Sequence, residues 1–209
     1  YKPKDYMPGP VISEPTLKFN FTKELYMDAI GRIKDYITAG DVYQVNLSQR
    51  IETHIDIPPY ELYKKLRSIN PAPFSSYLAF DDVAIISSSP ERFLKVNDRH
   101  VQTRPIKGTR PRGGDIKTDE MMKQALLASQ KDNAELTMII DLERNDLGRV
   151  CDYGSVKVTE RKVLETYPTV YHLVSTIEGD LYERYDFIDL LKATFPGGSI
   201  TGAPKIRAM

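Results

Sequence analysis

The sequence predicts an α+β fold in which antiparallel strands come in pairs and helices separate the pairs. Two hairpins support this prediction, one over residues 74–88 around Asp81-Asp82 and one over residues 93–104 around Asn97-Asp98. The helical patterns lie between strand pairs and do not follow every strand, which disfavours a doubly wound parallel sheet. The 209 residues are enough to bury one sizeable core.

The composition excludes several functional classes. The 29 Lys and Arg residues balance the 29 Asp and Glu residues, so no net charge favours nucleic acid or an anionic membrane as a partner. No apolar run approaches the roughly 18 residues of a membrane span, and no basic-then-apolar leader is visible. The single cysteine, Cys151, has no internal disulfide partner, so we expect a reducing, cytoplasmic location.

The start of the chain is predicted to be a lead-in or linker over residues 1–20, because prolines and a glycine gather before residue 16. Thr22 then caps a helix whose apolar residues recur every three or four positions, and Gly40 ends it. Alternation of apolar and polar residues predicts a strand over 43–51, with Gln44 on its polar face. A polar sheet face is common at a surface, and it also suits the lining of a polar ligand cavity.

The rest of the chain alternates between helical and extended patterns. Pro59 opens a short helix, and the Gly-, Pro- and Arg-rich segment 105–114 is predicted to be a loop. We expect helices over 118–129, 132–144 and 186–195, and strands over 156–158 and 170–177. The final residues, 201–209, have the pattern of a helix cut off in its first turns, so we expect an internal segment of a longer protein.

The segment from Pro196 to Lys205 has the composition of an anion cradle. Glycines let backbone N–H groups approach a ligand closely, and the following helix offers its positive end. The spacing is not that of a P-loop, because no Gly-Lys-Ser/Thr sequence follows. A glycine-rich turn between two helices explains the pattern about equally well.

Two charged residues stand in unusual positions. Lys107 lies between Pro-Ile and Gly, and a neutral lysine amine held in such a segment is a potential nucleophile; a solvated surface lysine is the more common alternative. Glu91 lies between two apolar strands, where a carboxyl group can act as a general acid. The alternative for Glu91 is a structural salt bridge, for example to Arg92.

Acidic residues and one histidine complete the candidates. Carboxylates on the helix around Glu135 suit Mg²⁺, although helical glutamates more often form a solvated face. His172 shares a side of its strand with Val170 and Val174, where a hydrogen-bonded structural imidazole is the usual interpretation. No zinc-ligand spacing and no nucleophile elbow is present.

Taken in order, five motifs resemble the chorismate-binding family, which includes anthranilate, aminodeoxychorismate, isochorismate and salicylate synthases. The motifs cover residues 39–50, Ser-Pro-Glu at 89–91, Pro-Ile-Lys-Gly-Thr at 105–109, residues 134–149, and Gly-Gly-Ser-Ile-Thr-Gly-Ala-Pro-Lys at 197–205. The resemblance extends over nearly the whole chain from about Phe21. It implies two stacked antiparallel sheets flanked by helices, with residues 21–209 forming a catalytic domain truncated at its C-terminal part.

The resemblance also implies roles for individual residues. Glu135 matches a ligand of Mg²⁺, and Glu91 matches the acid that protonates the departing C4 hydroxyl group of chorismate. His172 and Thr201 match residues near the reacting ring. The remaining matches are substrate-binding positions, namely Gln44, Thr109, Gly198, Ser199 and Gly202.

Position 107 indicates the branch of the family. Sequences resembling anthranilate synthase usually carry alanine between Pro-Ile and Gly-Thr, whereas those resembling aminodeoxychorismate synthase carry lysine, as here. Isochorismate and salicylate synthases place a water-activating lysine where this chain has Gln44. The resemblance therefore implies amination of chorismate for p-aminobenzoate and folate synthesis, with Lys107 forming a covalent adduct and a glutamine amidotransferase supplying ammonia.

Two alternatives stay open, an anthranilate synthase and a non-catalytic module that binds chorismate or tryptophan. The chain also departs from the family at its end, because the arginine and the second metal-binding glutamate that members carry further on are missing. We therefore expect that these 209 residues alone neither turn over chorismate nor bind Mg²⁺ tightly.

Overall fold

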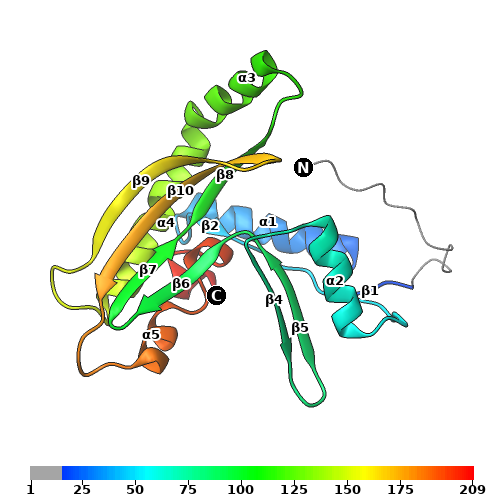
Figure 1. The fold of residues 1–209 in the computed structure, drawn as a ribbon, viewed down its shortest axis with the longest axis horizontal. Helices are drawn as coiled ribbons and strands as arrows, with labels where there is room; N and C mark the ends of the chain where they lie inside the picture. The colour runs from blue at the N-terminus through cyan, green and yellow to red at the C-terminus, as the bar shows by residue number, and fades with distance from the viewer. Residues whose placement is uncertain (1–15) are drawn as a thin grey trace. The chain divides into compact units, whose positions relative to one another are not determined.

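A computed structural model describes residues 16–209 (Figure 1). The described residues divide into two compact units. The first unit contains the described residues up to Thr38 together with Leu47–Glu91, and the second contains Ala39–Asn46 and Arg92–Met209. The predicted lead-in at residues 1–15 lies outside the described residues. Within residues 16–209, no helix is long and apolar enough to cross a membrane.

The first helix of the first unit is one that the sequence predicted. Helix α1, Lys23–Ala39, starts where the Leu25 N–H donates to Thr22 Oγ1 at 3.2 Å, and it ends at Gly40, whose φ is +80°. The short strands β1, Lys18–Phe19, and β3, Ile51–Glu52, flank it in sequence and pair antiparallel.

The rest of the first unit is a helix packed on a hairpin. Helix α2, Pro59–Ile69, lies against strands β4, Phe74–Ala79, and β5, Ala84–Ser89. The rings of Tyr60 and Tyr63 contact the ring of Tyr77, with centroids 5.3 and 5.8 Å away. The predicted hairpin around Asp81-Asp82 is confirmed.

The second unit is built on an antiparallel five-stranded sheet. Its strands are β6, Arg92–Asn97; β7, His100–Arg104; β8, Ile106–Pro111; β9, Lys157–Thr166; and β10, Val170–Asp180. Strand β10 is central, because β9 pairs with it along one side while β7 and β8 share the other side. The α+β class and the antiparallel pairing are confirmed.

Three predictions about strands were wrong. Segment 105–114 contains strand β8, because β10 is long enough to pair with β7 and then, beyond Pro105, with β8. Strand β9 extends to Thr166, well past the predicted residue 158, since β10 pairs with its charged half too. The predicted strand 43–51 is interrupted: only β2, Gln44–Val45, and β3 form, and they pair with different partners in different units.

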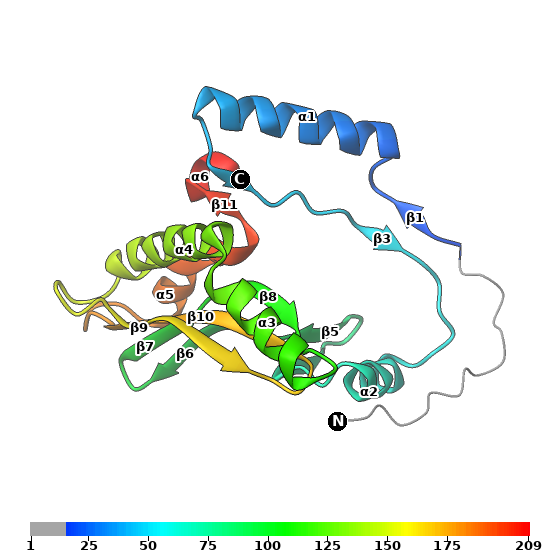
Figure 2. The same ribbon diagram turned by 90° about the horizontal axis from the view of Figure 1, so that it is seen from above.

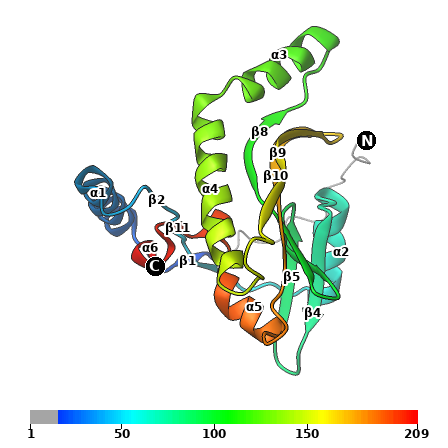
Figure 3. The same ribbon diagram turned by 90° about the vertical axis from the view of Figure 1, so that its left-hand side faces the viewer.

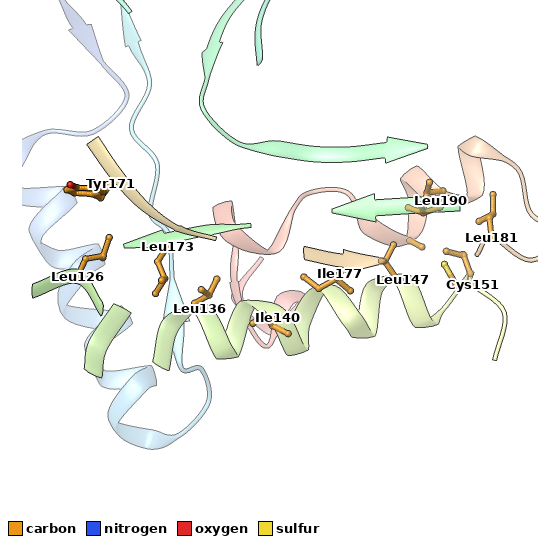
Figure 4. Close-up of a cluster of buried hydrophobic side chains, with 13 residues drawn as sticks. Leu126, Leu136, Ile140, Leu147, Cys151, Tyr171, Leu173, Ile177, Leu181 and Leu190 are labelled. Carbon is orange, nitrogen blue, oxygen red and sulfur yellow. The ribbon is translucent and has the colours of Figure 1, made fainter. Parts of the chain in front are cut away.

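Helix α4, Gln130–Gly148, runs along the sheet, and helix α3, Ile116–Leu127, precedes it (Figures 2 and 3). Leu136 and Ile140 lie on the side of α4 that faces Leu173 and Ile177 of β10 (Figure 4). These four side chains are buried, and they belong to the hydrophobic core of the second unit. Burial of such side chains stabilises the helix on the sheet by about 1.5–3 kcal/mol each.

The chain ends in a series of short elements beside α4. Helix α5, Phe187–Thr194, is capped by Asp186, whose carboxylate accepts hydrogen bonds from the N–H groups of Ile188 and Asp189. A 3₁₀ turn, Gly198–Ile200, then leads to β11, Gly202–Ala203, and to helix α6, Lys205–Ala208. The helix predicted over 186–195 is confirmed. Residues 196–205, which we call the glycine-rich segment, follow it and contain the 3₁₀ turn.

Candidate active site

The glycine-rich segment is held against residues 43–46 by a short antiparallel ladder. The N–H group of Tyr43 donates to the carbonyl of Ala203, and that of Asn46 donates to the carbonyl of Thr201, both at 2.7 Å. A Cβ atom at Gly202 would stand 2.3 Å from the Gln44 carbonyl oxygen. Only glycine therefore lets the two segments approach this closely.

Lys107 reaches this glycine-rich segment from β8. Its Nζ atom donates a hydrogen bond to the carbonyl oxygen of Ser199 at 3.0 Å, and the side chain is partly buried. The Nδ2 atom of Asn46 donates to the same oxygen at 3.2 Å. The structure thus brings three parts of the chain together at one carbonyl, and the lysine is not a freely solvated surface residue.

Thr109 and His172 form a second pair in the same unit. They are partners across β8 and β10, and Thr109 Oγ1 lies 2.9 Å from His172 Nδ1. The ring of Tyr167 meets the imidazole edge-on, with the ring centroids 5.4 Å apart. Burial lowers the pKa of His172, which Glu165 opposes, so the neutral imidazole is favoured at neutral pH.

A buried polar network lies where α4 meets the glycine-rich segment. Lys205 forms an ion pair with Asp146 and donates to the carbonyl of Thr194 at 3.0 Å. Thr103 Oγ1 donates to Glu143 Oε2 at 2.9 Å. Burial raises the pKa of Asp146, and Lys205 opposes that rise. Sequence reasoning missed this network, because nothing in the local pattern links Lys205 to an acidic residue on α4.

Glu135 is a half-exposed residue of α4 whose carboxylate lies 3.7 Å from the Lys131 amine. Over residues 16–209, no group of three or more His, Cys, Asp and Glu side chains is gathered closely enough to hold a metal ion. Mg²⁺ requires several oxygen ligands in near-octahedral geometry. The described residues therefore do not fit a complete Mg²⁺ site, and Glu135 offers one carboxylate only.

Of the other predicted site residues, Gln44 and Thr201 lie in the second unit and Glu91 lies in the first. Thr201 Oγ1 donates to the carbonyl of Gly197 at 3.2 Å, within the glycine-rich segment. The side-chain oxygen of Gln44 is buried and has no hydrogen-bond partner among the described residues. Glu91 belongs to the first unit, where its N–H group donates to Ser89 Oγ at 3.3 Å. The predicted convergence of Glu91 and Lys107 stays a prediction.

Comparison with known sequences finds relatives in the family that the five ordered motifs resemble. Residues 7–209 match a family described as chorismate binding enzyme. The chain is 47% identical over 189 residues to aminodeoxychorismate synthase component 1 of Bacillus subtilis, which covers 90% of this chain and 40% of that protein. It is 48% identical over 196 residues to anthranilate synthase component 1 of Pseudomonas aeruginosa, again covering 40% of the relative.

Comparison with solved structures gives the same fold. Anthranilate synthase component I of Streptococcus pneumoniae superposes with a TM-score of 0.82 at 34% identity, over 97% of this chain and 46% of that one. The isochorismate synthase MenF of Escherichia coli, at 20% identity and a TM-score of 0.77, shares the fold. The chain spans less than half the length of each of these proteins.

Proposed function

Because the chain belongs to the family of chorismate-binding enzymes, we propose that the complete protein aminates chorismate to 4-amino-4-deoxychorismate. The single observation that carries this choice is the lysine at position 107, on a strand next to the glycine-rich segment. The product would serve p-aminobenzoate and folate synthesis in the cytoplasm. A glutamine amidotransferase would supply the ammonia.

The proposed reaction uses two residues of this chain. The neutral amine of Lys107 attacks C2 of chorismate while the carboxyl group of Glu91 protonates the C4 hydroxyl, which leaves as water. Ammonia then adds at C4, and the bond between C2 and the lysine nitrogen breaks as the ring double bonds return. The enolpyruvyl group is retained throughout, and the lysine is regenerated.

Gln44 supports ammonia over water as the nucleophile. An amide side chain has no basic nitrogen and cannot activate a water molecule by taking its proton. Its buried oxygen can accept a hydrogen bond, and ammonia is a donor. His172 and Thr201 would lie near the ring, with the imidazole neutral, and Thr109, the partner of His172, would bind substrate. Gly198, Ser199 and Gly202 would surround a substrate carboxylate.

We propose that the complete protein requires Mg²⁺, with Glu135 as one of its ligands. The proposal does not extend to the 209-residue chain. No step above is assigned to the metal, since the described residues do not form its site. The requirement is tested by removing divalent ions from the complete protein and then restoring Mg²⁺.

Anthranilate synthase is the second candidate, because relatives of both kinds match this chain at nearly the same identity. Anthranilate formation expels pyruvate, whereas amination alone does not. A non-catalytic binding module is disfavoured, because such a module needs neither Lys107 nor Glu91.

The test incubates the complete protein with chorismate and an ammonium salt, followed by mass spectrometry of the products and a pyruvate assay. We expect an aminated product that retains its enolpyruvyl group, no stoichiometric pyruvate, and a large loss of rate in Lys107→Ala. Lys157→Ala, at an exposed lysine of β9, is the matched control and should keep the rate. Anthranilate with pyruvate, or an unchanged rate in Lys107→Ala, would contradict the proposal.

A further inference from the structure

We propose that Asn46 is a positioning residue for Lys107, acting through the carbonyl oxygen of Ser199. This inference rests on the proposed nucleophilic role of Lys107. It assigns a task to a residue that sequence reasoning did not select.

The Ser199 carbonyl is the point where the two side chains meet. Lys107 Nζ donates to it at 3.0 Å and Asn46 Nδ2 at 3.2 Å. A carbonyl oxygen has two lone pairs, so one acceptor satisfies both donors. The direction of this carbonyl therefore decides where the lysine amine is held.

Asn46 is well placed to fix that direction. Its own N–H group donates to the Thr201 carbonyl at 2.7 Å, at the end of the ladder formed by β2 and β11. Beyond that point the chain turns through Gly198–Ile200, and the Asn46 side chain extends the contact to Ser199. A backbone anchor and a side-chain donor on one residue thus hold the turn at two carbonyls.

The amide is also chemically suited to this position. It donates without carrying a formal charge, so it shares the acceptor with the lysine. A carboxylate in the same place would keep the size of the side chain but could not donate to the Ser199 carbonyl. Asn46→Asp therefore removes the donor that hydrogen-bonds to Ser199 while keeping a side chain of the same size.

The experiment measures amination of chorismate by the complete protein and by four variants: Asn46→Ala, Asn46→Asp, Lys107→Ala, and Asn46→Ala combined with Lys107→Ala. Loss of one hydrogen bond predicts a kcat about 5- to 10-fold lower for Asn46→Ala, with KM for chorismate within about twofold. For Asn46→Asp, which also lacks the donor, we expect a similar loss of kcat with KM again within about twofold. Added to Lys107→Ala, the Asn46 change should cause no further loss.

Gln49→Ala is the matched control, because the Gln49 amide is also exposed and donates to a backbone carbonyl, that of Phe21, at 3.5 Å. Its kcat should equal that of the unmodified protein. Thermal unfolding of each variant shows whether a lower activity comes from misfolding or from a displaced Lys107 amine. Asn46→Asp keeps the test valid if Asn46→Ala does not fold.

The outcomes separate the two proposals. If Lys107→Ala keeps full activity, the proposed function fails. If Lys107→Ala is slow but Asn46→Ala is normal, or if the two losses multiply in the double variant, only the role of Asn46 is overturned. An unchanged kcat in a folded Asn46→Asp protein would overturn it as well.

Discussion

Replacing Lys205 by methionine removes the cation from the buried ion pair with Asp146 and keeps most of the side-chain volume. The side chains of Lys205 and Asp146 are only 10% and 6% exposed, so water cannot replace the missing partner. Removing one member of such a pair costs about 3–5 kcal/mol, because a charge is left buried without compensation. We expect Lys205→Met to lower the free energy of unfolding by that amount at pH 7.

The penalty should depend on pH with a defined sign. Burial raises the pKa of Asp146 and Lys205 opposes that rise, so the pKa increases further in Lys205→Met. The folded variant then binds the Asp146 proton more tightly than the unfolded chain does. The stabilisation from protonation is complete below the unfolded value of about 3.9 and is lost as the pH rises through the folded value. The variant should therefore recover stability, relative to the unmodified chain, as the pH falls.

The assay is urea unfolding of the chain, followed by circular dichroism between pH 4 and 8. With a slope of about 2 kcal/mol per molar urea, the midpoint should fall by roughly 1.5–2.5 M at pH 7. Adding Asp146→Leu should restore most of the loss, since no charge is then left unpaired. Lys157→Met, at an exposed site, should change stability by less than about 0.5 kcal/mol. A loss below about 1 kcal/mol, or one that grows as the pH falls, would refute the reasoning.

Three further predictions follow from other parts of the structure. Burial raises the pKa of the Cys151 thiol to about 11, so a thiol-specific disulfide reagent at pH 8 should label it rapidly only in denaturant; rapid labelling of folded protein would contradict its placement. Hydrogen bonds from Arg112 and Tyr171 hold the pKa of Asp119 well below its usual range. The stability that these hydrogen bonds give to the folded chain is therefore present at neutral pH and is lost as the pH falls through the lowered pKa. The difference in melting temperature between the unmodified chain and Asp119→Asn should shrink toward pH 2, and a constant difference would count against it. Titration calorimetry of the 209-residue chain should show no tight Mg²⁺ binding and a product assay no turnover of chorismate, whereas turnover by this chain alone would show that the residues needed for catalysis are all present.

Local patterns predicted the helices well. The Thr22 cap and the periodic apolar residues of α1 are short-range features, and each appears in the structure where the pattern places it. The helices predicted over 132–144 and 186–195 also form at those positions. The hairpins around Asp81-Asp82 and Asn97-Asp98 were predictable for the same reason.

The strands that were missed depend on distant partners. Strand β8 has the composition of a loop, and it becomes a strand because β10, some 60 residues later in the chain, offers an edge to it. The charged half of β9 is likewise extended because β10 pairs with it. Such pairing leaves no mark in the local sequence.

In the candidate site too, local features could be predicted and long-range contacts could not. The residue types at positions 44, 107, 172 and 197–205 were recognisable from ordered motifs. The contacts of Lys107 and Asn46 with Ser199, and of Lys205 with Asp146, join residues that are 59 or more positions apart in the chain. Sequence patterns identify the chemistry available, and the folded chain decides which groups meet.

The central claim is that Lys107 forms a covalent bond to C2 of chorismate. The most direct measurement incubates the complete protein with chorismate in the absence of ammonia, digests the quenched protein and determines the masses of its peptides. The account predicts that the peptide carrying Lys107 gains the mass of chorismate less one water, and that added ammonium removes this mass as aminated product appears. Steady formation of aminated product with no mass change at Lys107 would contradict the account.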